Sequence, residues 1–316
     1  MAVADEFDAI ERLLRPLAEG APESLNLMDD AAVIPQRPGF DLVITKDAIV
    51  EGVHFLPGDP LDLVARKLLR VNLSDLAAKG AAAYGYFLAC AWPEARSWDD
   101  RALFAQGLAA DQKTFAVKLF GGDTVATTGP MVFSATMLGW VKAGRMVRRS
   151  GARSGDLVQV SGPIGDGWLG LRAARGALTG LPAGARERLA TVYRLPTPRL
   201  DVSLAGASAA ADVSDGLIAD AGHIAAASRL AFEIELSDMP LSPQAAVWLG
   251  EQPDRASALI SLATGGDDYQ IVATGKAPLH GFTVIGRVST GKGVRTLVEG
   301  VPHTIPNAGY RHGNEA

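Results

Sequence analysis

Residues 41–55 read DLVITKDAIVEGVHF, and their many β-branched side chains predict a β-strand with Asp47 and His54 at its polar positions. The apolar spacing that follows predicts a long helix over residues 62–82. Apolar residues at helical spacing also predict an amphipathic helix over residues 5–18, ended by a glycine and a proline. A long strand and long helices in one region indicate a mixed α/β protein rather than an all-β one.

The next segments continue this mixture. Strands are predicted over residues 115–119 and 131–141, with GGDT at 121–124 as the turn after the first. Another strand is predicted over residues 157–161, followed by a glycine loop and a helix from Trp168. Strands and helices do not alternate strictly, so the fold class is α/β of the mixed α+β kind.

The length of 316 residues predicts two domains. The polar, basic and glycine-containing segment 143–156 separates two strand-like runs, and we place the boundary there, giving domains 1–145 and 146–316. Thirty Lys and Arg residues against 35 Asp and Glu residues leave a net charge of −5. This balance does not favour a nucleic-acid partner, which usually selects a basic surface.

The cysteine content and the apolar runs exclude further classes. Cys90 is the only cysteine, so the chain has no intrachain disulfide and no cysteine-based zinc site. The longest apolar run, residues 81–92, is shorter than the roughly 20 residues that span a bilayer. The N-terminus is acidic and lacks the apolar core of a signal peptide. We therefore expect a cytoplasmic protein without a membrane partner.

Two glycine-containing motifs resemble phosphate-binding loops. Residues 286–292, GRVSTGK, nearly match a P-loop, but Gly293 replaces the metal-binding hydroxyl and the following residues favour a strand, so a hairpin turn is expected. Residues 165–170, GDGWLG, follow a strand and open a helix, as a dinucleotide site requires. The acidic residue expected about 20 positions later is missing there. A tight strand-to-helix turn is favoured, and a dinucleotide oxidoreductase stays an alternative.

The most informative feature is a set of aspartates beside Gly, Ala, Ser or Thr, which let a ligand approach closely. Each alone is usually a turn or a helix cap; DVSDG, residues 212–216, could be a capped helix start, and Asp75 could pair with Lys79. Asn72 and Asp75 share a helix face because they lie one turn apart. If the carboxylates converge, hard divalent cations would neutralise them, which favours an enzyme using several Mg²⁺ ions to hold a polyphosphate. The set comprises Asp29, Asp30, Asp47, Asp75, Asp123, Asp212, Asp215, Asp267 and Asp268.

These segments together resemble the thiamine-monophosphate kinases, which belong to a superfamily with aminoimidazole ribonucleotide synthetase and selenophosphate synthetase. The resemblance runs in order from about Glu6 to about His312. EGVHF with NLSDLAAKGA is typical of the kinase branch, whereas GGDT and DVSDGL are shared more widely. The matching motifs are MDDAAV, TKDAIVEGVHF, NLSDLAAKGA, GGDT, RSGARSGD, SGPIGDGWLGL, PTPR, DVSDGL, GGDDYQ and NAGYRH.

The resemblance implies that the γ-phosphoryl group of ATP passes to thiamine monophosphate, giving thiamine diphosphate and ADP with the help of several Mg²⁺ ions. It implies an aminoimidazole-ribonucleotide-synthetase-like fold of two α/β domains. The N-terminal domain, 1–145, would bind ATP and metal and form an intersubunit β-barrel in a homodimer. The C-terminal domain, 146–316, would be a second α/β unit.

The family's residue roles carry over to matching positions. Catalytic roles fall to Asp47, Asp123 and Arg149. ATP contacts fall to Gly121, Gly122, Arg149 and Ser214. Substrate contacts fall to His54, Asp267 and Tyr310, although without the family His54 could be an ordinary strand histidine and Tyr310 an ordinary surface aromatic. Metal contacts fall to Asp30, Thr45, Asp47, Asp75, Asp123, Asp212 and Asp215.

Three positions depart from the family pattern. Lys46 replaces a Thr or Ser, so a metal contact is either missing or replaced by the ammonium group. Asp267 replaces a Glu, and its shorter side chain would reach substrate through water. Arg148 and Arg149 are adjacent, and we expect Arg149 to contact phosphate because it directly precedes SGA.

Two alternatives to the kinase stay open. One is another ATP-using member of the superfamily, in which no phosphorylated product persists; the EGVHF segment argues against it. The other is a non-catalytic nucleotide-binding protein on the same fold, since fold alone does not give function. The nearly complete aspartate set argues against the second.

Overall fold

The computed structural model describes residues 6–310, which form two compact units. Of these residues, the first unit takes in those up to Leu76 together with Ala81–Met146, and the second takes in Ala77–Gly80 and those from Val147 onward. None of the helices within residues 6–310 combines the length and the apolar composition that crossing a bilayer requires. Each unit has its own buried apolar core.

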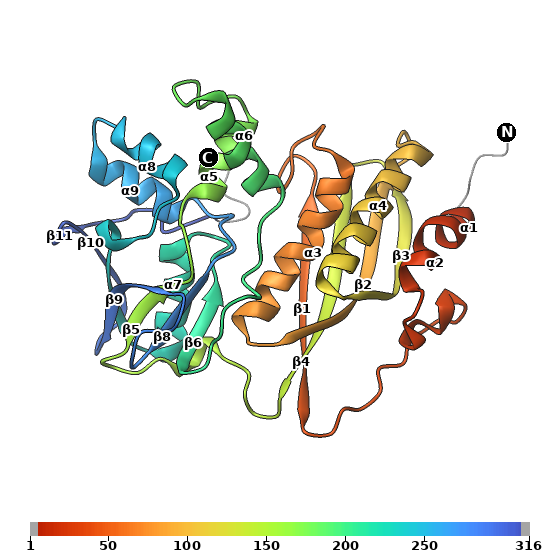
Figure 1. Cartoon of the computed structure of the whole chain (residues 1–316), viewed down its shortest axis with the longest axis horizontal. Helices are drawn as coiled ribbons and strands as arrows, with labels where there is room; N and C mark the ends of the chain where they lie inside the picture. The colour runs from red at the N-terminus through yellow and green to blue at the C-terminus, as the bar shows by residue number, and fades with distance from the viewer. Residues whose placement is uncertain (1–5, 311–316) are drawn as a thin grey trace. The chain divides into compact units, whose positions relative to one another are not determined.

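The first unit is a four-stranded sheet of order β1-β4-β2-β3, with β1 and β3 at its edges and only the β2–β3 pair parallel. Two long helices, α3 and α4, lie along one face of this sheet (Figure 1). A helical stretch, π-helical in its middle part, precedes the sheet. The elements are α1 (Glu6–Ala9), η1 (Ile10–Leu14), α2 (Arg15–Ala18), η2 (Pro22–Leu27), β1 (Phe40–Val50), α3 (Leu61–Ala78), β2 (Ala82–Pro93), α4 (Trp98–Phe115), β3 (Lys118–Thr127) and β4 (Val132–Lys142).

The two faces of β1 differ in burial. Val43 and Ile49 are buried toward α3, and Thr45 and Asp47 between them are half-buried, because side chains alternate along a strand. Leu42 and Ile44 point the other way, and Ile44 is 60% exposed. The sheet is therefore covered by helices on one face and has exposed apolar side chains on the other.

The second unit is a seven-stranded sheet of order β11-β10-β7-β9-β5-β8-β6, in which only the β7–β10 pair is parallel. Helix α7 packs against this sheet, and α5 packs against α6. The elements are η3 (Arg149–Gly151), β5 (Leu157–Val160), α5 (Asp166–Ala174), α6 (Ala183–Arg194), β6 (Ala207–Asp212), α7 (Leu217–Ser228), β7 (Ala231–Glu235), η4 (Leu236–Asp238), α8 (Pro243–Gly250), α9 (Arg255–Thr264), β8 (Ile271–Gly275), β9 (Thr283–Ser289), β10 (Gly293–Val298) and β11 (Val301–His303).

Several predicted elements are correct and two need their limits moved. The helix near 5–18 and the strand near 131–141 are present, and the helix predicted over 62–82 is present but ends at Ala78, since Ala82 already begins β2. The strand predicted over 41–55 ends at Val50, because the next residues form a turn in which the Gly52 amide donates to the Phe55 carbonyl. Gly52 has a φ of +82°, a conformation that glycine adopts readily.

The prediction around GGDT is wrong. Phe115 ends α4, a helix that the sequence analysis did not identify, although its Ser97–Asp100 capping box is a recognisable start signal. GGDT lies inside β3, not in a turn after it. A Cβ on Gly122 would lie 1.9 Å from the Leu88 carbonyl oxygen of β2. The glycine therefore allows close approach of neighbouring strands.

The predicted hairpin at residues 286–292 is also wrong in one respect. A turn is present and a strand, not a helix, follows it, as expected for a segment that is not a P-loop. However, β9 and β10 do not pair with each other, because β7 lies between them in the sheet. The turn thus connects two strands on either side of a third.

Candidate active site

A group of polar side chains lies where β1 meets α3, and we call Thr45, Asp47, Asn72 and Asp75 the Asp47 cluster. The Thr45 hydroxyl donates to the Asp75 carboxylate, and the Asn72 side-chain oxygen accepts from the Asp47 amide at 3.1 Å. Asn72 and Asp75 share the helix face that the spacing predicts. The structure thus brings together three predicted metal ligands, Thr45, Asp47 and Asp75.

The electrostatics of this cluster favour a cation. Burial, and then the nearby Asp75 carboxylate, raise the pKa of Asp47 to about 6. Two carboxylates and a hydroxyl offer hard oxygen ligands, the type that Mg²⁺ prefers. The donor set therefore fits a magnesium ion, whose charge would offset the repulsion between the two acids.

A second group of predicted residues lines a cavity of about 500 Å³ beside β3, which we call the Asp123 cavity. Its lining includes Asp29 and Asp30 from the loop after η2, and Gly121, Gly122 and Asp123 from β3. Side chains of Asp30 and Asp123 are exposed. Glycine amides beside exposed carboxylates suit a polyphosphate that carries metal ions.

The Asp47 cluster and the Asp123 cavity belong to opposite edges of the first sheet. Asp47 lies on β1 and Asp123 on β3, with β4 and β2 between them. Three strand spacings amount to about 14 Å. The sheet of one chain therefore does not place these two carboxylates around one ion, so the convergence considered for the aspartates does not include this pair within one chain.

In the second unit, backbone hydrogen bonds join two predicted motifs. The Asp267 amide donates to the Ser214 carbonyl at 2.8 Å, and the Tyr310 amide donates to the Asp215 carbonyl at 2.9 Å. Glycines permit this contact, since a Cβ on Gly266 would lie 2.6 Å from the Ser214 carbonyl oxygen. The structure thus brings together Ser214, Asp215, Asp267 and Tyr310, four predicted site residues. Asp212 ends the neighbouring strand β6 and is buried.

Asp220 is a buried acid that the sequence analysis missed. Its carboxylate accepts the amides of Ser214 and Asp215, at 3.0 and 3.1 Å, and so holds the DVSDG loop. Burial and then the Asp215 carboxylate raise its pKa to about 7, although the two amide donors and, to a smaller extent, the Arg149 charge lower it. Ligand atoms of Asp215, Asp220 and His223 lie within 4.8 Å of one another.

The glycine motif at 165–170 has an internal explanation. The Asp268 carboxylate accepts the amides of Gly165 and Gly167, with the shortest contact at 2.8 Å, at the start of α5. Burial raises the pKa of Asp268 to about 8 despite these two amide donors, which lower it. A dinucleotide pyrophosphate would need the same amides. The motif is therefore a strand-to-helix turn closed by the protein's own carboxylate.

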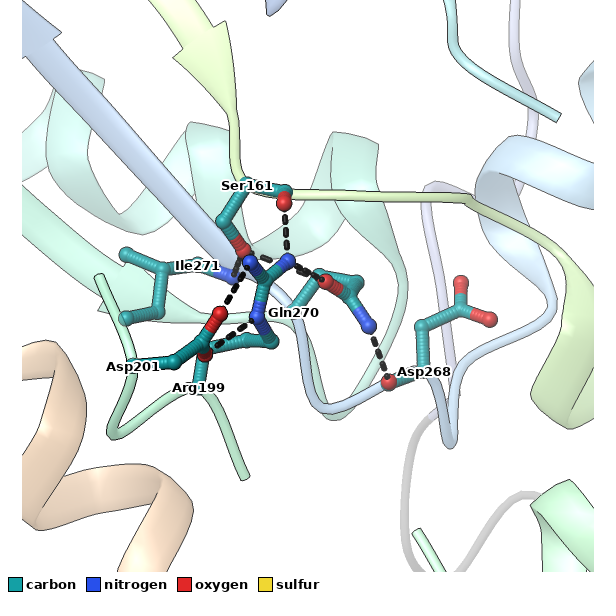
Figure 2. A network of polar contacts seen from close by, with 6 residues as sticks. All are labelled: Ser161, Arg199, Asp201, Asp268, Gln270 and Ile271. Carbon is teal, nitrogen blue, oxygen red and sulfur yellow. Dashed lines mark hydrogen bonds and ion pairs between the residues drawn. The ribbon is translucent and has the colours of Figure 1, made fainter. Parts of the chain in front are cut away.

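A network of polar contacts connects the end of β5, next to Ser161, to the start of β8 near Asp268 (Figure 2). The Arg199 guanidinium donates to the Ser161 carbonyl, to the Gln270 side-chain oxygen at 2.9 Å and to Asp201. The Ser161 hydroxyl accepts the Ile271 amide at 2.8 Å. Arg199 belongs to the PTPR motif, so that motif supports the GGDDYQ loop.

His54 lies in the turn after β1, not within the strand. Its Nδ1 accepts the Val50 amide at 3.1 Å, and its backbone carbonyl accepts from Lys67 Nζ at 2.9 Å. Lys67 is only 2% exposed, and no local sequence pattern distinguishes it from the other charged residues of α3. The buried Lys67 thus stabilises the turn that contains His54 through this hydrogen bond.

Comparison with known proteins agrees with this arrangement of two α/β units carrying carboxylate groups. The family description "AIR synthase related protein, N-terminal domain" matches residues 28–141, and "AIR synthase related protein, C-terminal domain" matches residues 153–299. Fold and site thus define an enzyme of the two-domain AIR synthase related class.

Individual relatives narrow the class. The thiamine-monophosphate kinase of Caulobacter vibrioides is 51% identical, over 98% of this chain and 91% of its own length. A crystal structure of the Stenotrophomonas maltophilia thiamine-monophosphate kinase has a TM-score of 0.80 and 36% identity, covering 96% of this chain and 99% of that one. AaThiL, complexed with AMPPCP and TMP, has a TM-score of 0.78 and 29% identity, covering 88% and 89% of the two chains. The chain belongs to the thiamine-monophosphate kinase family and is a phosphotransferase.

Proposed function

We propose that this chain transfers the γ-phosphoryl group of ATP directly to thiamine monophosphate, in line and with several Mg²⁺ ions. The observation that carries the proposal is the Asp47 cluster, where two carboxylates and a hydroxyl meet on the helix-covered side of β1. A complex of AaThiL with AMPPCP and TMP supports ATP and thiamine monophosphate as the substrates.

The chemistry needs no general base. The acceptor is a phosphate monoester whose second pKa is about 6, so near neutral pH its oxygen is already ionised. That oxygen attacks the γ-phosphorus, the bond to the bridging oxygen breaks, and ADP leaves. Two unit charges 4 Å apart repel by about 4 kcal/mol at an effective dielectric of 20, so catalysis requires charge neutralisation. Bound Mg²⁺ would supply that neutralisation and align the two phosphates.

Named residues take the following roles in this proposal. Asp47 and Asp123 are catalytic through the metals that they hold, and Arg149 offsets transition-state charge. Gly121, Gly122, Arg149 and Ser214 contact ATP, and His54, Asp267 and Tyr310 contact thiamine monophosphate. The metal ligands are Asp30, Thr45, Asp47, Asp75, Asp123, Asp212 and Asp215. Residues 1–145 form the ATP-binding and dimerisation domain, and residues 146–316 form the second α/β domain.

We further propose a homodimer in which β1 of one copy lies beside β3 of the other, closing two open sheets into an intersubunit barrel. Two features support it: the outer edges of β1 and β3 have no partner strand within the described sheet, and Leu42 and Ile44 expose apolar surface on the face without helices. The same pairing would bring Asp47 of one copy toward the partner subunit's Asp123. A dimer would thus complete a site that one chain leaves divided.

Product analysis tests the activity. Purified protein is incubated with ATP, Mg²⁺ and thiamine monophosphate, with thiamine as a parallel acceptor, and thiamine diphosphate and ADP are quantified. The proposal predicts equal amounts of both products, and loss of both with EDTA. ADP without the diphosphate would indicate a superfamily relative with another acceptor, and the absence of ADP would indicate a non-catalytic nucleotide-binding protein.

Mixing two inactive variants tests the shared site. In a mixed dimer of Asp47→Asn and Asp123→Asn chains, one of the two sites receives both wild-type carboxylates. Random assortment therefore restores about a quarter of wild-type activity if the subunits exchange. If Asp47 and Asp123 act within one chain, mixing restores nothing.

A further inference from the structure

The loop Gly265–Gln270, between α9 and β8, has an unusual backbone. Asp267 has a φ of +61° and Tyr269 a φ of +50°, both in the left-handed region that non-glycine residues seldom adopt. Such conformations cost free energy and persist only where surrounding contacts impose them. Two of them within three residues therefore require strong external support.

That support comes from both sides of the loop. The amides of Asp267 and Tyr269 donate to the carbonyls of Ser214 and Val213, both at 2.8 Å. Asp268 between them is anchored on the α5 amides, as described above. The backbone at Asp267 is thus held in place by hydrogen bonds to the Val213–Ser214 backbone and by the buried Asp268 carboxylate.

The side chains of Asp267 and Tyr269 lie together in this loop. The Tyr269 hydroxyl donates to Asp267 Oδ1 at 3.0 Å, across only two positions of sequence. Tyr269 is only 9% exposed, so its packing limits where the hydroxyl can lie, whereas Asp267 is half-buried. The hydroxyl therefore fixes the orientation of a carboxylate that is accessible to a ligand.

We infer that Tyr269 is a positioning residue for substrate binding, which holds the Asp267 carboxylate in the orientation that contacts thiamine monophosphate. The inference rests on the proposed function, which assigns Asp267 to this substrate. A carboxylate that is already held in its bound orientation loses less rotamer freedom when thiamine monophosphate binds. The hydrogen bond from Tyr269 therefore increases the affinity for this substrate. The affinity for ATP and the rate of phosphoryl transfer are not affected.

Steady-state kinetics of Tyr269→Phe test this inference, since phenylalanine keeps the ring and removes only the hydroxyl. We expect the KM for thiamine monophosphate to rise by roughly 5- to 10-fold, as the loss of one typical intramolecular hydrogen bond implies. The kcat and the KM for ATP stay unchanged. Tyr193→Phe, at another buried tyrosine of the same unit, is the matched control and leaves all three constants unchanged.

The double variant distinguishes positioning from a general structural role. If Tyr269 acts through Asp267, then Tyr269→Phe with Asp267→Asn has the same KM for thiamine monophosphate as Asp267→Asn alone. Additive effects would overturn the inference, and so would a lower Tm for Tyr269→Phe with an unchanged KM. If Asp267→Asn itself leaves the KM unchanged, the assignment of Asp267 in the proposed function fails instead.

Discussion

Asp47, which is half-buried, and Asp268, which is buried, are both acids beside small residues, yet their surroundings differ in kind. Asp47 faces another carboxylate, Asp75, and lies beside a hydroxyl that donates to that acid. Asp268 faces two backbone amides at the start of α5. Both have raised pKa values, about 6 and about 8, so the shift alone does not separate them. The neighbouring groups do separate them. A carboxylate beside other oxygen ligands requires a cation to offset the repulsion, whereas a carboxylate beside backbone amides already accepts hydrogen bonds from the protein.

The largest expected effect separates these two acids in catalysis. Asp47→Asn should lower kcat by at least about 100-fold, because in the proposed mechanism Asp47 is a metal ligand at the site of phosphoryl transfer. Asp268→Asn should leave kcat within about twofold, because an amide oxygen can still accept the α5 amides. Both are measured at saturating Mg²⁺, with circular dichroism to verify folding. Near-normal turnover of Asp47→Asn and of Asp123→Asn would refute the metal assignment.

Tyr310 should show a smaller, binding-only effect. It is 50% exposed and lines a cavity of about 900 Å³ together with Asp215, His223 and His303. If its ring stacks on the pyrimidine of thiamine monophosphate, Tyr310→Ala raises the KM for this substrate by roughly 2- to 10-fold with little change in kcat. An unchanged KM would exclude Tyr310 from the site, and Tyr310→Phe should keep most of the affinity.

The pH dependence of stability should sharpen the comparison further. The pKa of Asp268 is about 8 in the folded protein, against 3.8 for an aspartate in the unfolded chain. Between these pH values the folded protein therefore keeps a proton that the unfolded chain has released. Stability therefore falls as pH rises from about 4 to about 8. Asp268→Asn cannot ionise, so its Tm should fall less steeply over the same interval. Equal slopes for the two proteins would show that Asp268 is ionised in the fold.

The smallest effect is expected at Lys46. Its neighbours Thr45 and Asp47 face α3, so the Lys46 side chain points to the opposite face, where Nζ lies 3.4 Å from Thr136 Oγ1. The ammonium group therefore does not replace a metal ligand within the Asp47 cluster. Lys46→Thr should change kcat and the Mg²⁺ requirement by less than about twofold. A larger gain in Mg²⁺ affinity would show that Lys46 competes with the metal.

The same comparison shows what the sequence could predict. Asn72 and Asp75 follow from the helical repeat, and the strand that carries Asp47 follows from its β-branched residues, since both signals are local. The role of Asp268 could not be predicted from local sequence, because its amide partners lie about a hundred residues away in the chain. Asp220 and Tyr269 were missed for a related reason. Their importance depends on loop conformations, including two left-handed residues, that no local pattern specifies.

Errors in the fold have the same origin. Glycines in GGDT indicated a turn, but they permit β3 to approach the Leu88 carbonyl, a contact that depends on sheet order. The turn at 286–292 indicated a hairpin, but β7, distant in sequence, lies between its strands. Local patterns therefore predicted which segments are strands more reliably than which strands are neighbours.

Metal binding tests the central claim most directly. Mn²⁺, as a probe for Mg²⁺, is titrated into wild-type protein, Asp47→Asn and Asp268→Asn in the presence of a non-hydrolysable ATP analogue, and free Mn²⁺ is followed by electron paramagnetic resonance. We predict that Asp47→Asn loses at least one bound ion relative to wild type and that Asp268→Asn binds as wild type does. Unchanged binding by Asp47→Asn, or an equal loss in both variants, would contradict the distinction between an acid that holds a cation and an acid that holds the fold.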